Sequence, residues 1–173
     1  MTAQAIPTRT PLSAGAAELR LTPASPANRT TPIVAAVDGS SASRSAIEIA
    51  VKLAVELSDA PLVFVYVRRG PAGFLGTPIF QRRLTAEMAR ARRALARALR
   101  AAARAGVDAE GEILEGSPHK RILEFARDRG ARLIVVGSGR RRCSRSVSGG
   151  VLRAAEGPVV VARSHRPLLA DVR

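Results

Sequence analysis

The chain of 173 residues has one cysteine, no tryptophan and no long apolar run, and each shortage excludes a class of protein. A lone cysteine, Cys143, can form neither an internal disulfide nor a cysteine-based zinc site. Aromatic residues make up only 3% of the chain, too few to build the stacking platforms of single-strand binders. No segment approaches the ~18 apolar residues of a membrane helix, and no secretory signal is evident. We expect a soluble, cytoplasmic protein without a membrane partner.

Acidic residues are also few, with 14 Asp and Glu against 28 Lys and Arg, which gives a formal net charge of +14. All the cationic side chains except Lys52 and Lys120 are arginines. This excess of positive charge favours anionic partners, although a GC-rich coding sequence produces the same arginine-rich composition. With so few aromatic residues, specific nucleic-acid recognition is not expected, and non-specific nucleic-acid binding is kept as a remote alternative.

The chain divides into a tail, a domain and a second tail. Residues 1–30 contain four prolines among threonine, alanine and serine and show no periodicity, which predicts a flexible N-terminal tail. Residues 31–163 carry regular apolar segments and form the predicted domain. Residues 164–173 are predicted to be a short C-terminal tail.

Within the domain, continuous apolar runs alternate with segments of helical periodicity. The runs predict five strands, at 33–37, 62–67, 107–115, 133–136 and 159–163. Buried runs of this kind are typical of parallel strands, and helices between them serve as crossovers. The fold class is therefore predicted as α/β: a three-layer, doubly wound domain with a five-stranded, mostly parallel sheet.

The longest predicted helix, roughly 80–105, has an arginine face. Leu95 and Ala98 represent its apolar side, and the opposite side carries Arg93, Arg97, Arg100 and Arg104. We expect this arginine face to be solvated, with contact to a polyanion as the alternative. The short helix near 147–155 is expected to bury Val147, Val151, Leu152 and Ala155.

In a doubly wound sheet, ligands bind beyond the carboxyl ends of the strands, which selects the loops after Val37, Val67 and Val136. Asp38 follows the first of these strands and can accept hydrogen bonds from ribose hydroxyls or hold a cation through water; a turn-forming Asp-Gly is the alternative. Gly137-Ser138-Gly139 ends a strand before a helix, where exposed N–H groups can bind phosphate. The sequence has no complete dinucleotide fingerprint and no GxxxxGK[ST] motif.

Other chemistry has little support in the sequence. His119 and His165 are expected to be solvated rather than catalytic. Cys143 lies among four arginines, which favours a thiolate; an incidental loop thiol is expected, with a redox sensor as the alternative. No nucleophile–base pair and no metal-binding cluster is evident, so we do not expect an enzyme.

Three fragments in order resemble the universal stress protein family across residues 31–163. Val37-Asp38-Gly39-Ser40, followed by Ser43 and Ala46, is similar to the VDGSxxSxxA start of that family. The stretch from Gly116-Ser117-Pro118 to Val136-Gly137-Ser138 resembles its central segment, and 146–161 resembles its GSVSxxV and PVLVV ending.

The resemblance implies a Rossmann-like, adenine-nucleotide-binding fold and a homodimer. Its ATP-binding branch has the motif G-x2-G-x9-G-[ST], from which this chain departs. Gly137 matches the first glycine, but Arg140 and Arg145 take the second and third places, and the loop is about five residues shorter. Arginine is costly where a phosphate-binding loop needs positive φ, yet guanidinium groups bind phosphate directly. Arg140 to Arg142 and Arg145 could therefore form a substitute anion site.

The resemblance also assigns roles to matching positions. It implies that Ala36 and Asp38 line the ribose and adenine, and that Val67 contacts adenine through its backbone. The residues expected to face the phosphates are Gly137, Gly139, Arg140, Ser146 and Val147. The function implied is a stress-associated regulatory module that binds ATP or another adenine nucleotide weakly, with Mg²⁺ accompanying the nucleotide. The alternative is a nucleotide-free homodimeric interaction protein that pairs through Val159–Ala162.

Overall fold

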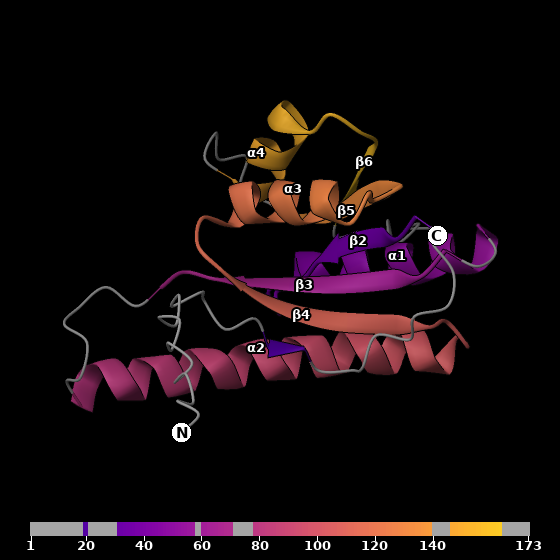
Figure 1. Ribbon diagram of the computed structural model, residues 1–173. Coiled ribbons are helices and arrows are strands. Elements are labelled where there is room, and N and C mark those ends of the chain that lie inside the picture. Colours follow the sequence, from indigo (N-terminus) through magenta and orange to yellow (C-terminus); the bar gives the residue numbers. More distant parts are fainter. Residues whose placement is uncertain (1–18, 21–30, 58–59, 71–77, 140–145, 164–173) are drawn as a thin grey trace, which may run out of the picture.

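The computed structural model describes residues 19–20, 31–57, 60–70, 78–139 and 146–163. Strands and helices alternate along most of the chain, as the sequence predicts (Figure 1). In chain order the elements are β1 (Leu19–Arg20), β2 (Ile33–Ala36), α1 (Ser41–Glu56), β3 (Leu62–Arg68), α2 (Pro78–Arg104), β4 (Ala109–Glu115), α3 (Pro118–Asp128), β5 (Leu133–Ser138), α4 (Val147–Ala154) and β6 (Val159–Arg163).

The strands form one sheet in the order β1-β4-β3-β2-β5-β6. From β4 to β6 every neighbouring pair is parallel, so five parallel strands carry the fold. The chain starts this parallel set at β2, moves outward to β3 and β4, and then returns across β2 to β5 and β6. The predicted doubly wound α/β architecture is confirmed, and its reversal point lies between β3 and β5.

A sixth strand was not predicted. Leu19 and Arg20 pair antiparallel with Ile113 and Glu112 on the outer side of β4. They fall inside the segment that the sequence indicates to be a flexible tail, because two residues are too few to produce a periodic pattern. β6 forms the opposite edge of the sheet, and no described strand pairs with its outer side.

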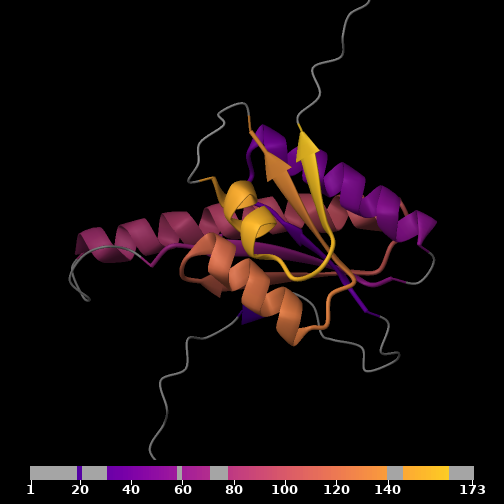
Figure 2. The same cartoon turned by 90° about the horizontal axis from the view of Figure 1, so that it is seen from above.

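Two helical layers cover the sheet (Figure 2). α1 and α2 pack on one face and α3 and α4 on the other. Successive side chains of a strand point to opposite faces, so Ile33 and Ala35 join the core under α1 while Val34 joins the core under α3. Both faces of β2 are therefore buried, which explains its continuous apolar sequence.

Only the second half of α2 is packed against the sheet. Its fully buried residues begin at Ala91 and include Leu95 and Ala98, as the apolar periodicity predicts. The first half of the helix extends past the sheet (Figure 1). The arginine face formed by Arg93, Arg97, Arg100 and Arg104 is exposed along its whole length, as both a solvated surface and contact with a polyanion require.

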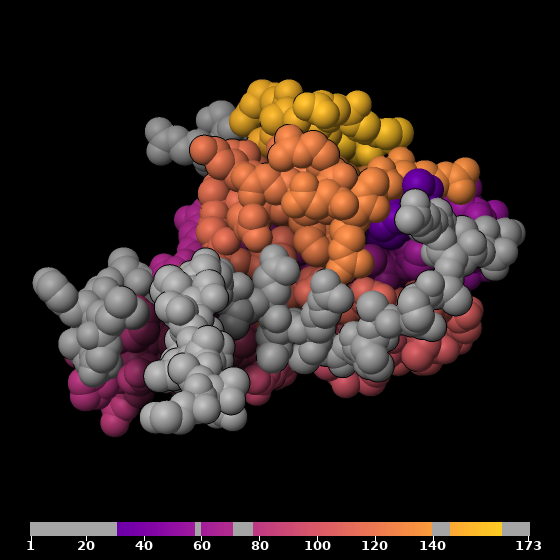
Figure 3. Space-filling model, viewed as in Figure 1, coloured from indigo at the N-terminus to yellow at the C-terminus, as the bar shows by residue number. Residues whose placement is uncertain are grey.

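The contact between α3 and α4 corrects two expectations. On this side of the molecule the two helices form one continuous surface (Figure 3). Leu152 is 58% exposed rather than inward, because the short α4 buries Val151 and turns its next residue to solvent. His119 is half-buried, and a Cβ on Gly150 would lie 2.9 Å from the Cβ of His119. The histidine therefore packs against a glycine of α4 instead of being fully solvated.

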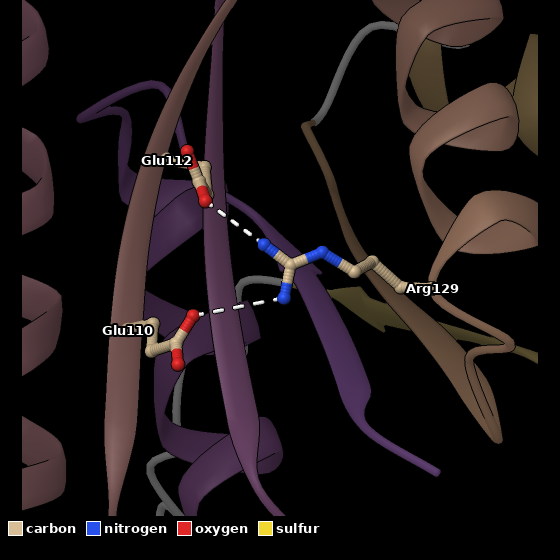
Figure 4. Close-up of polar contacts among 3 residues, drawn as sticks. All are labelled: Glu110, Glu112 and Arg129. Carbon is tan, nitrogen blue, oxygen red and sulfur yellow. Dashed lines mark hydrogen bonds and ion pairs between the residues drawn. The ribbon is translucent and has the colours of Figure 1, made fainter. Parts of the chain in front are cut away.

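A buried carboxylate joins α3 to the sheet (Figure 4). The guanidinium of Arg129, just after α3, donates to Oε1 of Glu112 at 3.0 Å and lies 3.7 Å from Oε2 of Glu110. Arg129 also lies 5.0 Å from the centre of the Phe125 ring. Glu112 is 1% exposed, so its charge needs this partner. The cluster positions the end of α3 against β4.

Candidate functional site

Three strand ends converge at the reversal point of the sheet. β2 pairs in parallel with both β3 and β5, with Ile33 opposite Leu62 on one side and opposite Leu133 on the other. The pairing continues past β2, where the amide of Val37 donates to the carbonyl of Val65 at 2.9 Å. The loops after these strands therefore leave the sheet side by side. This confirms the expectation on which the predicted site depends.

A cavity of about 430 Å³ lies between these loops. This volume is in the range of pockets that hold small organic ligands. Seven of the eight residues expected at the site line it, and Arg140 lies outside the described residues, as do Arg141, Arg142, Cys143, Arg145 and His165. The seven are Ala36, Asp38, Val67, Gly137, Gly139, Ser146 and Val147.

Other residues of the cavity wall were not predicted. Val65, Ile122 and Val136 form an apolar floor, and hydroxyl groups come from Ser40, Ser41, Ser43 and Ser148. Val37, Ala42 and Pro118 complete the wall. Val65 lies two positions before Val67 on the same face of β3, so the alternation of the strand could have identified it, and Val136 directly precedes Gly137. Ile122 comes from α3, and only the packing of that helix brings it here.

Asp38 begins a tight turn at the mouth of the cavity. Its Oδ1 accepts a hydrogen bond from the amide of Ser40 at 2.9 Å, and its own amide donates to Oγ of Ser43 at 3.2 Å. Gly39 between them has φ of 83°, a left-handed conformation that favours glycine. Ser40 in turn caps α1 by accepting from the amide of Ser43 at 3.1 Å. One carboxylate oxygen of Asp38 is thus used to hold the turn, and Oδ2 is available to a ligand.

The amino end of α4 faces the same cavity. Ser146 caps this helix by accepting from the amide of Gly149 at 3.1 Å, and its carbonyl accepts from the amide of Gly150. No described residue accepts from the amides of Val147 and Ser148, which lie on the cavity wall. Since α1 also begins at this cavity, two helix amino ends direct partial positive charge into it. The arrangement suits an anionic group.

Gly137 has a structural reason to be glycine beyond ligand approach. A Cβ at this position would overlap the carbonyl of Ala42 and lie 3.0 Å from the amide nitrogen of Ser43. The end of β5 therefore packs directly on the first turn of α1. Gly139, two residues later, has nothing within 4 Å of such a Cβ. An added side chain would therefore clash with backbone at Gly137 but would meet no neighbouring atom at Gly139.

Tyr66 lies on the other face of β3, close to the same loops. Burial raises the pKa of its phenol, and the negative charges of Glu87 and Asp38 raise it further, while the Arg90 guanidinium lowers it. The phenol therefore stays neutral near neutral pH. Within the described ranges, no group of three or more histidine, cysteine, aspartate or glutamate side chains could hold a metal ion. None of the described helices is long and apolar enough to cross a membrane.

Comparison with known proteins agrees with this geometry. The family model of the universal stress protein family matches residues 30–163. The universal stress protein UspA from Lactobacillus plantarum is 28% identical and has a TM-score of 0.67, with 79% of this chain and 99% of that chain covered. A universal stress protein family member from Burkholderia pseudomallei is 30% identical, with a TM-score of 0.64 and coverage of 79% and 98%.

A third solved structure contains a ligand. The universal stress protein from Archaeoglobus fulgidus in complex with dAMP is 25% identical, with a TM-score of 0.63, and 78% of this chain and 99% of that chain are covered. Comparison with the curated proteins finds no match. Since the family model spans the whole parallel α/β domain, and the solved structures share its fold, the chain belongs to the universal stress protein family.

Proposed function

We propose that this protein is a regulatory module that binds an adenine nucleotide in the cavity between β2, β3 and β5. The observation that carries the proposal is that seven residues from the ends of β2, β3 and β5 and the start of α4 line one cavity of suitable size. The dAMP complex of the Archaeoglobus fulgidus relative supports the ligand class.

The cavity offers a distinct surface to each part of a nucleotide. Adenine would lie on the apolar floor made by Val65, Ile122 and Val136, beside the backbone of Val67. Oδ2 of Asp38 would accept from a ribose hydroxyl at the mouth. The amides of Val147 and Ser148, at the amino end of α4, would donate to the phosphate oxygens.

The phosphate end is where this chain differs from the ATP-binding motif of its family. The shortened loop carries arginines where that motif has glycines, and we expect the affinity for ATP to be weakened or altered. A Mg²⁺ ion is expected to accompany the nucleotide. The proposal includes no dedicated catalytic step.

Asp38→Ala is expected to weaken binding of an adenine nucleotide about 10-fold or more, because a hydrogen bond to a charged group contributes about 1.5–3 kcal/mol. Isothermal titration calorimetry of the wild type and the variant measures the difference. Asp108→Ala is the matched control, since Asp108 is exposed and precedes β4 at the opposite rim of the sheet. Equal affinities in wild type and Asp38→Ala would remove Asp38 from the site. A wild type that binds no nucleotide, and releases none when denatured, would refute the proposed function.

A second candidate function, homodimeric interaction without nucleotide, is favoured by the edge of β6. The carbonyl of Pro158 accepts from the amide of Ile134, so it points toward β5. Because backbone direction alternates along a strand, the amides of Val159 and Val161 point outward from the edge. Val159–Ala162 of two copies could pair antiparallel across a two-fold axis, which would cover both edges.

Val161→Pro is expected to convert such a dimer to a monomer, since proline removes an outward N–H and leaves the bonds to β5 in place. Val161→Ala is the matched control, because it shortens the side chain but keeps the amide. Sedimentation velocity at micromolar concentration distinguishes the two states. A wild type that sediments as a strict monomer, or a dimer that persists in Val161→Pro, would contradict pairing through β6.

A further inference from the structure

α2 carries an unusual concentration of exposed charge of one sign. All of its arginines are exposed, and Glu87 is its only acidic residue. From Gln81 to the end of the helix, the exposed residues other than arginine are small or neutral: Gln81, Thr85, Ala86 and Ala103. The arginines are Arg82, Arg83, Arg90, Arg92, Arg93, Arg97, Arg100 and Arg104.

The arginine face repeats at steps of four, three and four residues from Arg93 to Arg104. Side chains spaced in this way lie on one side of a helix, and at ~1.5 Å per residue they stand ~5 Å apart along its axis. Arg82, about three turns before Arg93, lies on the same side and extends the row to roughly 33 Å. The result is a straight row of cations on a rigid support.

This charge is not neutralised within the described part of the protein. No described carboxylate forms an ion pair with an α2 arginine. Three arginines outside α2 are paired: Arg68 with Glu115, Arg121 with Glu124, and Arg129 with Glu110 and Glu112. The α2 arginines repel one another instead, and an external polyanion would relieve that repulsion.

The surroundings of the arginine face indicate which kind of polyanion it would bind. An interfacial membrane helix needs a free apolar face, but the apolar face of α2 between Ala91 and Ala102, beneath the arginine face, is packed on β3 and β4. Recognition of single strands needs aromatic stacking platforms, and the exposed side of α2 from Gln81 onward has no aromatic residue. What remains is contact with the phosphates of a duplex, whose regular charges lie along a rigid rod.

We propose that the exposed arginine face of α2 binds the phosphate backbone of duplex nucleic acid without sequence preference. This function is separate from the cavity, which lies between β2, β3 and β5, and also from the β6 edge, because α2 packs on β3 and β4. A dimer paired through β6 would present two such faces. Arginine suits the task because its guanidinium binds phosphate oxygens in a bidentate manner.

The test uses fluorescence anisotropy of the full chain with two labelled duplexes of unrelated sequence, each about 20 base pairs long. Four phosphate contacts predict an affinity that falls about 100-fold between 50 and 200 mM salt, equally for both sequences. We expect at least a 10-fold loss of affinity at 50 mM salt in the variant Arg93→Gln, Arg97→Gln, Arg100→Gln, Arg104→Gln. The slope of log affinity against log salt concentration should become less steep by about 0.9 for each phosphate contact removed.

A matched control separates the α2 face from net charge. The variant Arg44→Gln, Arg69→Gln, Arg127→Gln, Arg132→Gln loses the same charge from exposed positions outside α2, and its affinity is expected to stay within about 3-fold of the wild type. An equal loss in both variants would show a net-charge effect and overturn the proposal. So would the absence of duplex binding at 50 mM salt, or binding to phosphatidylserine vesicles or inorganic polyphosphate in preference to the duplex. Thermal melting curves confirm that both variants are folded.

Discussion

Gly137→Ala is expected to destabilise the domain by about 3 kcal/mol, the upper part of the usual range for forcing an extra methyl into packed structure. The new Cβ would overlap the carbonyl of Ala42 and approach the amide of Ser43, both backbone groups in the first turn of α1. Backbone cannot rotate aside as a flexible side chain does, so β5 and α1 must separate. For a domain of this size, the melting temperature should fall by roughly 10 °C.

Gly139→Ala provides the control for this prediction. It lies two residues later, just after β5, and lines the same cavity, but an added Cβ meets nothing within 4 Å. Its melting temperature should stay within about 2 °C of the wild type, since surface changes away from such contacts usually cost less than ~0.5 kcal/mol. Equal melting temperatures for the two variants would show that β5 does not pack on α1 in this way. A loss of nucleotide binding in Gly137→Ala alone would follow from the same displacement.

Arg129→Met is expected to cost about 3 kcal/mol, because it removes the cation from a carboxylate that is almost fully buried. Glu112 is 1% exposed and accepts from Arg129 at 3.0 Å, while Glu110 lies on the same side of β4 (Figure 4). Methionine keeps much of the apolar volume of the arginine stem, so the loss reports the charge rather than a cavity. Urea unfolding measures the change in free energy.

Two further variants separate the buried pair from a general effect on α3. Arg127→Met changes an exposed arginine at the same end of the helix and should alter stability by less than ~0.5 kcal/mol. The double variant Glu112→Leu, Arg129→Met removes both charges and should recover most of the loss, since apolar residues of similar volume replace buried ion pairs at little cost. Equal stabilities of Arg129→Met and Arg127→Met would mean that the Arg129–Glu112 contact does not stabilise the fold.

The proposed nucleotide site and the arginine face depend on different parts of the fold. The cavity requires three loops from distant parts of the sequence to meet, and the register of β2 with β3 and β5 brings them together. The arginine face needs only one straight helix that is anchored along its apolar side by residues such as Leu95 and Ala98. A substitution that disrupts the ends of these strands should therefore weaken nucleotide binding and leave the arginine face intact.

Much of the fold could be predicted because its strands are buried on both faces. Ile33–Ala36 and Leu62–Val67 are continuous apolar runs, and such runs separated by amphipathic helices indicate a doubly wound sheet. The candidate site followed from the same pattern, since it had to lie where the strand order reverses. Asp38, Val67 and Gly137 could be identified on this ground together with the family resemblance, and all three line the cavity.

Other features could not be predicted, because they depend on contacts between elements that are far apart in the sequence. The two residues of β1 pair with β4 although they carry no strand pattern. His119 is half-buried because Gly150 of α4 lies against it, and Leu152 is exposed because α4 packs through Val151 and the next residue points to another side of the helix. The close approach of β5 to α1 gives Gly137 a packing role that no local spacing indicates.

Hydrophobic periodicity, which acts over a few residues, by itself determined the order of strands and helices, the apolar side of α2 and the loops that a ligand would use. Only the tertiary structure decided that those loops enclose a cavity of about 430 Å³, that Glu112 is buried beside Arg129, and that the arginines of α2 form no ion pair with a described carboxylate. The reason is physical: burial, ion pairing and cavity shape are set by which residues of separate elements meet in space, and a linear pattern does not contain those distances.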